Sequence, residues 1–385
     1  MQAEQDAHIQ VLKTQMVLCN VCAAEKSKSD AESSHPRALA SHPPTPTQLR
    51  GYLQPSKERE LSIIEEARVE SLKAESLKTG PPSPRSPETA TAPKNQPRER
   101  KSRHSKMSIP PQLQQQLRLL IRANHILHHH GLVDAFGHIS VRHPLNKEQY
   151  IIAAYDPGAP ALVKNMSDFI SYWVKDSTPV DPDAPQGYSE RYIHGEILRR
   201  FPKVNCVVHS HSEDVIPFTV GHGARDPHPV RPVFHMAGFL GQGGASVFTM
   251  DSLYGTARAP SEHDLLIKNA TLGAALAARF SPENPVVLQH KHGFTTFGAT
   301  IEEAVYRAIY TQKNCILLQR AIAIAGGDAE AVSYLSAQEI KDCAIMNKKT
   351  LDKSFRLWVR EVQVNSLYEN EEGEPEKGKV AGMKM

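Results

Sequence analysis

The chain has 385 residues, of which 40% are hydrophobic and 23% charged, and its formal net charge is +3. This composition is ordinary for a soluble protein with a core, and the charge is too small to indicate a nucleic-acid or membrane partner. No apolar run approaches the length of a membrane span, and the first residues fit neither a secretion signal nor a transit peptide. The 5 cysteines are odd in number and scattered, which indicates a reducing compartment, the cytoplasm.

The sequence changes character near residue 107. Residues 1–107 are rich in Pro, Ser, Thr and charge. We expect them to form a disordered, low-complexity extension, because they lack the apolar density that offsets chain entropy. Cys19 and Cys22 form a CxxC pair there, but the sequence has no second pair to complete a zinc ribbon. Residues 108–367 have a globular pattern, and residues 368–385 are predicted to be a disordered tail.

Helical and strand patterns are mixed within residues 108–367. A helical run over 111–130 ends at Gly131, a usual C-cap residue. Strands are predicted at FGHISVRHP and YIIAAY, followed by a helix that opens at Ser189 as its N-cap and stops at Pro202. Strands at NCVVHSHS and PVVLQH come next, and then a long helix closed by Gly326 and Gly327. These elements predict a layered α/β domain.

The segment VVHSHS places His209 and His211 two residues apart in a predicted strand. Side chains alternate faces along a strand, so both imidazoles point the same way, roughly 6–7 Å apart. A metal ion can lie between two such imidazoles, since neutral imidazole is a common zinc ligand. The alternative is an exposed polar face of a strand.

A third histidine follows another apolar strand, in VVLQHKHGF. His292 precedes Gly293, where the backbone can turn sharply, and a histidine at the end of a buried strand can complete a three-histidine site. His290 is the alternative third ligand, because it lies two residues earlier and shares the face. A loop histidine without a ligand role is the other interpretation.

Glu190 lies in the first turn of the helix that leads through Pro202 into the HxH strand. A carboxylate at a helix N-terminus is stabilised by the helix dipole, so Glu190 can be a solvated residue with no further role. Its position also makes it a candidate acid/base. Glu196 and Glu213 compete for that assignment.

Several motifs occur together and in a fixed order: Ser189-Glu190, HSH at 209–211, His292-Gly293 with Gly298, and Glu-Glu-Ala at 302–304. This combination resembles the class II aldolase/adducin superfamily, and GLVDAFGHISVRHP resembles its glycine-rich first strand and turn. The resemblance spans roughly residues 110–335. It implies a three-layer α/β/α domain around a largely antiparallel central sheet, assembled as a homotetramer with sites between subunits.

The resemblance also implies roles for particular residues. It implies that His209, His211 and His292 hold a divalent metal, Zn²⁺ or another such as Mn²⁺, and that Glu190 is the acid/base. Ser189 and the loop residues Gly137, His138 and Ser140 fall where relatives bind the anionic end of a substrate.

His138 departs from the family's sugar-phosphate aldolases, which usually have Asn at this position in a phosphate-binding loop. The patterns GHISVRHP, SERYIHGEI and PVFHMAGFLG resemble more closely the branch that decarboxylates hydroxylated aromatic or muconic-semialdehyde-type acids. In that branch His138, Arg142 and His235 are expected to contact a carboxylate or hydroxyl group. Tyr306 and Tyr310 lie one turn apart on the long helix, where either can donate a proton or pack against the sheet; Tyr310 is the candidate we retain.

The chemistry expected of such a site is cleavage of a C–C bond beside a carbonyl, by aldol cleavage or decarboxylation. A metal bound to the carbonyl and a neighbouring hydroxyl stabilises the enolate or enediolate that forms. The expected substrate is therefore a small hydroxy- or oxo-acid or an aldol. A non-catalytic adducin-like scaffold and a sugar-phosphate dehydratase or epimerase are the alternatives. The three histidines favour an enzyme over the scaffold.

Overall fold

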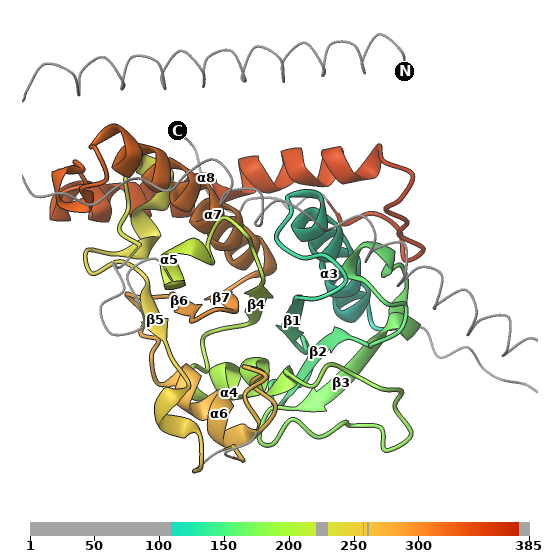
Figure 1. Ribbon diagram of the computed structural model, residues 1–385. Coiled ribbons are helices and arrows are strands. Elements are labelled where there is room, and N and C mark those ends of the chain that lie inside the picture. Colours follow the sequence, from blue (N-terminus) through green and yellow to red (C-terminus); the bar gives the residue numbers. More distant parts are fainter. Residues whose placement is uncertain (1–108, 221–229, 257, 260–261, 377–385) are drawn as a thin grey trace, which may run out of the picture. The chain divides into compact units, whose positions relative to one another are not determined.

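The computed structural model describes residues 109–376, except 221–229, 257 and 260–261 (Figure 1). Its centre is a seven-stranded sheet in the order β3-β2-β1-β4-β7-β6-β5, antiparallel throughout except for the parallel pair β5–β6. The strands are β1 His138–Arg142, β2 Gln149–Ala153, β3 Phe169–Trp173, β4 Cys206–Ser210, β5 Ser246–Phe248, β6 Val286–Gln289 and β7 Gly293–Gly298. The predicted α/β fold class, with its largely antiparallel sheet, is confirmed.

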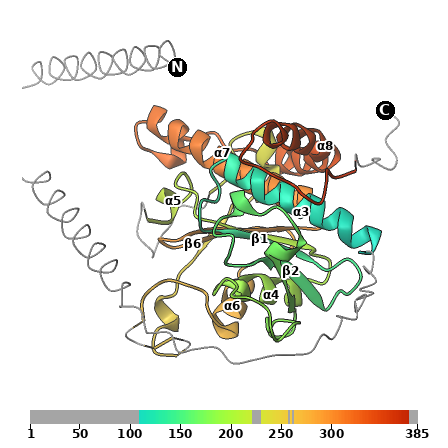
Figure 2. The same cartoon turned by 90° about the vertical axis from the view of Figure 1, so that its right-hand side faces the viewer.

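Helices cover both faces of the sheet (Figure 2). One layer contains α3 Pro111–His129, α7 Ile301–Ile324 and α8 Ala337–Gln363, and the other contains α4 Arg191–Arg200 and α6 Ala270–Ala277. The short helix α5 Pro217–Val220 follows β4. Adjacent residues of β4 belong to opposite cores, Val208 to the first layer and Val207 to the second, as the two-residue period of a strand requires.

Local sequence signals explain where the long helices start and stop. The Thr300 hydroxyl accepts the Glu303 N–H at the start of α7, and Gly326 and Gly327 follow its end with φ of 68° and 92°. Ser336 and Glu339 form a capping box at the start of α8, a helix that our sequence analysis did not identify. No helix in the described part of the chain is both long and apolar enough to cross a membrane.

Three boundaries differ from the prediction. The N-cap of α4 is Glu190 rather than Ser189, and neither side chain caps the helix in the usual way. Strand β4 ends at Ser210, so His211 lies in the following loop. Residues 368–376, predicted to be tail, pack on α3: Tyr368 is buried, and Arg122 pairs with Glu374. The predicted extension 1–107, with its CxxC pair, and residues 377–385 lie outside the described residues.

Candidate metal centre

Three strands bring the site together at one end of the sheet. His138 of β1, His209 of β4 and Thr295 of β7 are cross-strand partners, so their side chains share one face. His292 lies in the turn between β6 and β7, immediately before Gly293. A Cβ atom on Gly293 would lie 2.0 Å from the Ser210 carbonyl oxygen. Glycine is therefore required there, and it lets the turn carry His292 against the end of β4.

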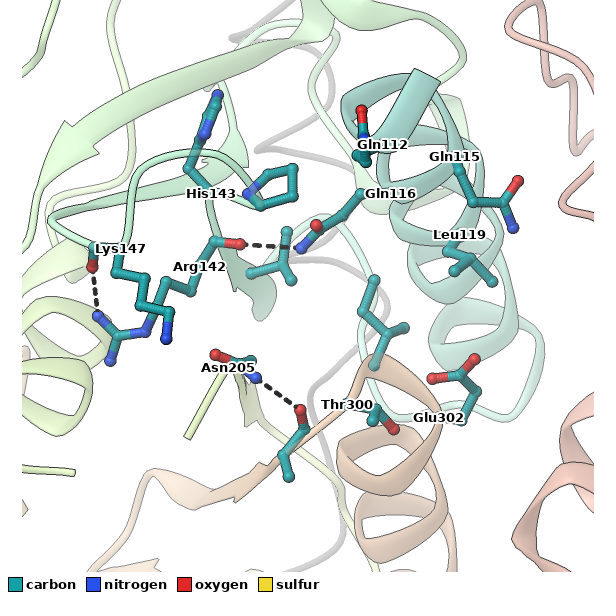
Figure 3. Close-up of a pocket in the computed structure, with 14 residues that line it drawn as sticks. Gln112, Gln115, Gln116, Leu119, Arg142, His143, Lys147, Asn205, Thr300 and Glu302 are labelled. Atoms are coloured by element: carbon teal, nitrogen blue, oxygen red, sulfur yellow. Dashed lines mark hydrogen bonds between the residues drawn. The ribbon is translucent and has the colours of Figure 1, made fainter. Parts of the chain in front are cut away.

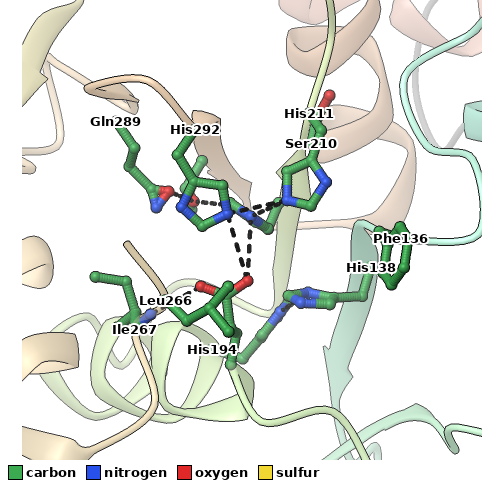
Figure 4. Close-up of polar contacts among 12 residues, drawn as sticks. Phe136, His138, His194, Ser210, His211, Leu266, Ile267, Gln289 and His292 are labelled. Atoms are coloured by element: carbon green, nitrogen blue, oxygen red, sulfur yellow. Dashed lines mark hydrogen bonds and ion pairs between the residues drawn. The ribbon is translucent and has the colours of Figure 1, made fainter. Parts of the chain in front are cut away.

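Four side chains converge at this end of the sheet (Figure 4). Nε2 of His211 lies 3.0 Å from Nε2 of His209 and 3.0 Å from Nε2 of His292. Oε2 of Glu190 lies 3.7 Å from the His209 nitrogen and 3.5 Å from the His292 nitrogen. The other carboxylate oxygen, Oε1, accepts the Ile267 N–H at 2.8 Å, which holds the side chain in place. All four potential ligand atoms lie within 4.8 Å of one another.

Burial keeps the imidazoles of His209 and His211 in the neutral form that binds a metal. Desolvation, followed by repulsion from His292 and His211, lowers the pKa of His209 well below 6.5, and desolvation also lowers the pKa of His211. A neutral imidazole donates through one nitrogen and offers a lone pair at the other. His209 Nδ1 lies 3.0 Å from the Thr295 hydroxyl, and its Nε2 faces the other histidines. Three such nitrogens beside one carboxylate fit a divalent zinc-type ion, whose usual ligands are these groups.

A second group of buried polar side chains lies beside these four. His138 Nδ1 is 2.7 Å from His194 Nε2, and His194 Nδ1 is 2.7 Å from the Ser140 hydroxyl. The exposed fractions are 3% for His138 and 0% for His194 and Ser140. The His138 ring also lies against the rings of Tyr188 and His209, with centroids 4.8 Å and 5.1 Å away. His138 is thus fixed at the border of the four-residue cluster (Figure 4).

Residues 118–318 match the family described as Class II Aldolase and Adducin N-terminal domain. The chain belongs to this family. Among curated proteins it is similar to the decarboxylase tropJ of Talaromyces stipitatus, with 39% identity over 279 residues that cover 69% of this chain and 99% of that protein. It is also similar to the 3,4-dihydroxyphthalate decarboxylase of Arthrobacter keyseri, with 29% identity over 191 residues, 48% of this chain and 69% of that one. This class II aldolase domain is therefore related to decarboxylases.

The fold agrees with a solved member of the family. An aldolase II superfamily protein from Pseudomonas syringae superposes with a TM-score of 0.53 at 18% identity, covering 68% of this chain and 96% of that one. At this identity the likeness concerns the fold alone.

Two other predicted loop residues of the class II aldolase domain lie next in the chain to residues of the site, Gly137 before His138 and Ser189 before Glu190. Gly137 has φ of 79°, and a Cβ there would lie 2.8 Å from Val133, so this glycine shapes the turn into β1. Ser189 is exposed in the turn before α4. Ser140, predicted to contact substrate, is instead buried against His194.

Arg142 must be corrected as a substrate ligand. It lies at the other end of β1, about 13 Å from His138 along the strand. Its guanidinium donates to the carbonyl oxygens of Lys147, Leu198 and Val204. The structure therefore gives Arg142 a structural role in the main-chain packing around β1.

His235 and Tyr310 do not join the cluster in this chain. His235 is exposed, and Tyr310 on α7 packs against Tyr306 and Trp358 with ring centroids 4.5 Å and 6.0 Å away. The rival ligands and acids also lie apart from the four: Glu196 pairs with Arg199, and Glu213 and His290 are not among the converging groups.

His194 and Thr295 were not predicted from the sequence as site residues. His194 lies four residues after Glu190 in the predicted helix, so both residues fall on one helical face. That spacing was a usable signal. Thr295 has no comparable signal, because its neighbour His209 is 86 positions away and only the β4–β7 register joins them.

Proposed function

We propose that this protein is a divalent-metal-dependent decarboxylase of a small hydroxylated aromatic or oxo carboxylic acid. The observation that carries the proposal is the convergence of His209, His211 and His292 on one point, with Glu190 Oε2 beside them. The similarity to two decarboxylases favours this reaction over aldol cleavage within the same family.

The three histidines would hold the metal, Zn²⁺ or Mn²⁺, with the Glu190 carboxylate beside it. When bound, such an ion supplies positive charge that stabilises negative charge developing on substrate oxygen atoms. The lowered pKa values of His209 and His211 suit this task, because their neutral rings release no proton when they bind the ion.

The side chains around the cluster suit an aromatic acid. The Tyr188 ring packs on the imidazole of His138, which borders the cluster. Decarboxylation breaks the C–C bond to the carboxylate, releases CO₂ and leaves an electron pair on carbon, to which a proton must be added. Glu190 is the acid we propose for that step. Its Oε1 is held by the Ile267 N–H while Oε2 stays on the side of the cluster, within reach of a bound substrate.

The first test measures metal and activity in the full-length chain. We expect near-stoichiometric zinc or manganese by elemental mass spectrometry, and CO₂ release from 3,4-dihydroxyphthalate as a probe acid. His292→Ala should lose the metal and the activity. His290→Ala is the matched control, because it removes an imidazole two residues away that lies outside the cluster.

The outcome can contradict the proposal in two separate ways. A folded wild-type chain that takes up no added divalent metal would refute the metal centre and favour an adducin-like scaffold. A metal-loaded chain that releases no CO₂ from any hydroxyaromatic acid but cleaves an aldol would refute the decarboxylase assignment alone.

We also propose a homotetramer, as the family resemblance implies. Apolar side chains remain exposed on the last turns of α7, with Ile324 89% and Leu317 38% exposed, and a second copy would cover them. Light scattering of the full-length chain should give four chain masses. A monomer would contradict this assembly without affecting the metal centre.

A further inference from the structure

The buried row formed by Ser140, His194 and His138 is not explained by metal binding. None of its members is among the four converging ligand groups. Each side chain is nonetheless at least 97% buried, and both contacts in the row are 2.7 Å long. Burying three polar groups in line costs free energy unless each hydrogen bond is made, so the row must be fully paired.

Pairing fixes the direction of the hydrogen bonds. Burial lowers the pKa of His194 to about 3, so its ring is neutral with one N–H. Among the described residues, the Ser140 hydroxyl has one hydrogen-bond partner, His194 Nδ1. If His194 donated to Ser140, the hydroxyl hydrogen would be left without an acceptor at a site with 0% exposure. Ser140 therefore donates to His194.

The remaining protons follow from this direction. Since His194 Nδ1 accepts, its proton is on Nε2, which donates to His138 Nδ1. His138 then carries its own proton on Nε2. This atom has no hydrogen-bond partner among the described residues, and its ring lies beside His209 at the border of the cluster (Figure 4). A hydrogen bond to one ring nitrogen commonly sets the tautomer of a functional histidine.

We propose that His194, held by Ser140, is a positioning residue that fixes His138 as an Nε2–H donor for an anionic oxygen of the substrate. This inference rests on the proposed function, because it names the group that binds the carboxylate or phenolate of the acid. It also explains why this chain has histidine at position 138. An imidazole can accept the His194 N–H at Nδ1 inside the protein and donate its own N–H toward the site at Nε2.

The tautomer can be read without any turnover. In the full-length chain labelled with ¹⁵N-histidine, long-range ¹⁵N–¹H couplings distinguish Nδ1–H from Nε2–H, and His138→Gln assigns the signal. We expect Nε2–H in the wild type and a mixture of tautomers in Ser140→Ala. An Nδ1–H ring at His138 in the wild type would overturn the inference and leave the proposed function intact.

Kinetics then test what the donor does. His194→Phe removes the donor to His138 and fills similar space, while His194→Gln places an amide N–H near the position of Nε2. With 3,4-dihydroxyphthalate as probe, we expect KM to rise about 10- to 100-fold in His194→Phe, as for loss of one hydrogen bond to a charged group. In His194→Gln we expect KM to rise by no more than about threefold. Both variants should keep their full metal content.

The variants give decisive alternatives. Unchanged KM in His194→Phe, or loss of metal in that variant, would overturn the positioning role. If His194→Phe does not fold, Ser140→Ala carries the same test. It removes only the hydroxyl oxygen, and the hydrogen bond between His194 and His138 can then run in either direction. A wild type that binds metal and has the Nε2–H tautomer but decarboxylates nothing would refute the proposed function, not the orientation of His138.

Discussion

The two ends of the central strands differ in how their polar groups are satisfied. At one end His209, His211 and His292 turn their Nε2 atoms toward one another and toward Glu190. At the other end a cavity of about 540 Å³ is lined by residues of α3, β1 and the start of α7 (Figure 3). Two of its polar side chains are paired within the protein: Gln116 donates to the Arg142 carbonyl, and Asn205 to the Ala299 carbonyl.

This difference teaches that open volume is a weaker guide to function than convergence of groups without protein partners. Arg142 is the clearest case. A buried guanidinium beside a cavity suggests an anion site, yet its N–H groups donate to three main-chain carbonyls. The histidine cluster has the opposite character, because nitrogens that each present a lone pair cannot satisfy one another and call for a cation.

The largest expected effect at the histidine end is on turnover. Glu190→Gln keeps an oxygen to accept the Ile267 N–H but removes the acid, so kcat should fall by about 10²–10⁴-fold while the bound metal stays. Stopped-flow or CO₂ release assays with parallel metal analysis measure both. Glu213→Gln, an exposed carboxylate on the loop after β4, is the matched control and should match the wild type. An unchanged kcat in Glu190→Gln would exclude Glu190 from proton transfer.

At the cavity end, the expected effect is on stability alone. Arg142→Met removes three charged hydrogen bonds to carbonyl oxygens, and the free energy of unfolding should drop by about 2–4 kcal/mol. Urea titration measures this loss. KM and kcat, measured at a temperature where the variant is folded, should equal those of the wild type. A large rise in KM would show that Arg142 is a substrate ligand after all. The cavity end would then have a functional role as well as a structural one.

The sequence predicted the parts of this site that depend on short-range pattern. The HxH motif, His292 before Gly293, and Glu190 at a helix start are visible within a few residues, and the family resemblance orders them. Arg142 was misassigned because its partners Lys147, Leu198 and Val204 are joined only by the folded chain. The buried row was missed for the same reason: Ser140 and His194 are 54 positions apart.

Boundaries were predicted less well than elements. The strand with His209 and the long helix closed by Gly326 were identified, but α8 was not, although Ser336 and Glu339 give it a capping box. The acidic segment after residue 367 was assigned to the tail from its composition. The basic residues of α3 that bind it, such as Arg122, lie some 250 positions away, beyond what local pattern can indicate.

A smaller effect distinguishes two adjacent threonines of β7. Thr295 contacts His209 Nδ1, whereas the Thr296 hydroxyl donates to the Pro285 carbonyl. Thr295→Val should weaken metal affinity by about 10- to 100-fold, because it removes the group that orients a ligand. Thr296→Val is the control: it loses one buried hydrogen bond, about 1 kcal/mol of stability, and no metal affinity. Competition with a chelator measures the metal affinity of both variants. Equal affinities in the two would show that Thr295 does not orient His209 as a ligand.

The smallest expected effect concerns pH and again separates the two ends. The unfolded His194 imidazole takes up a proton below about pH 6.5, whereas the folded one does so only near pH 3. Its contribution to stability is therefore present above pH 6.5 and is lost as pH falls toward 3. At about pH 5.5 the loss amounts to about 1.4 kcal/mol.

His194→Gln should remove that part of the pH dependence. Urea titrations at about pH 7.5 and 5.5 should show a smaller drop in unfolding free energy than in the wild type, by about 1.4 kcal/mol. His143→Gln, at the half-buried histidine lining the cavity at the other end, should change the drop by less, because desolvation lowers its pKa less severely. If the two variants changed the drop in unfolding free energy equally, His194 would have to be protonated in the folded protein at pH 5.5. That result would contradict the neutral His194 that the paired row requires.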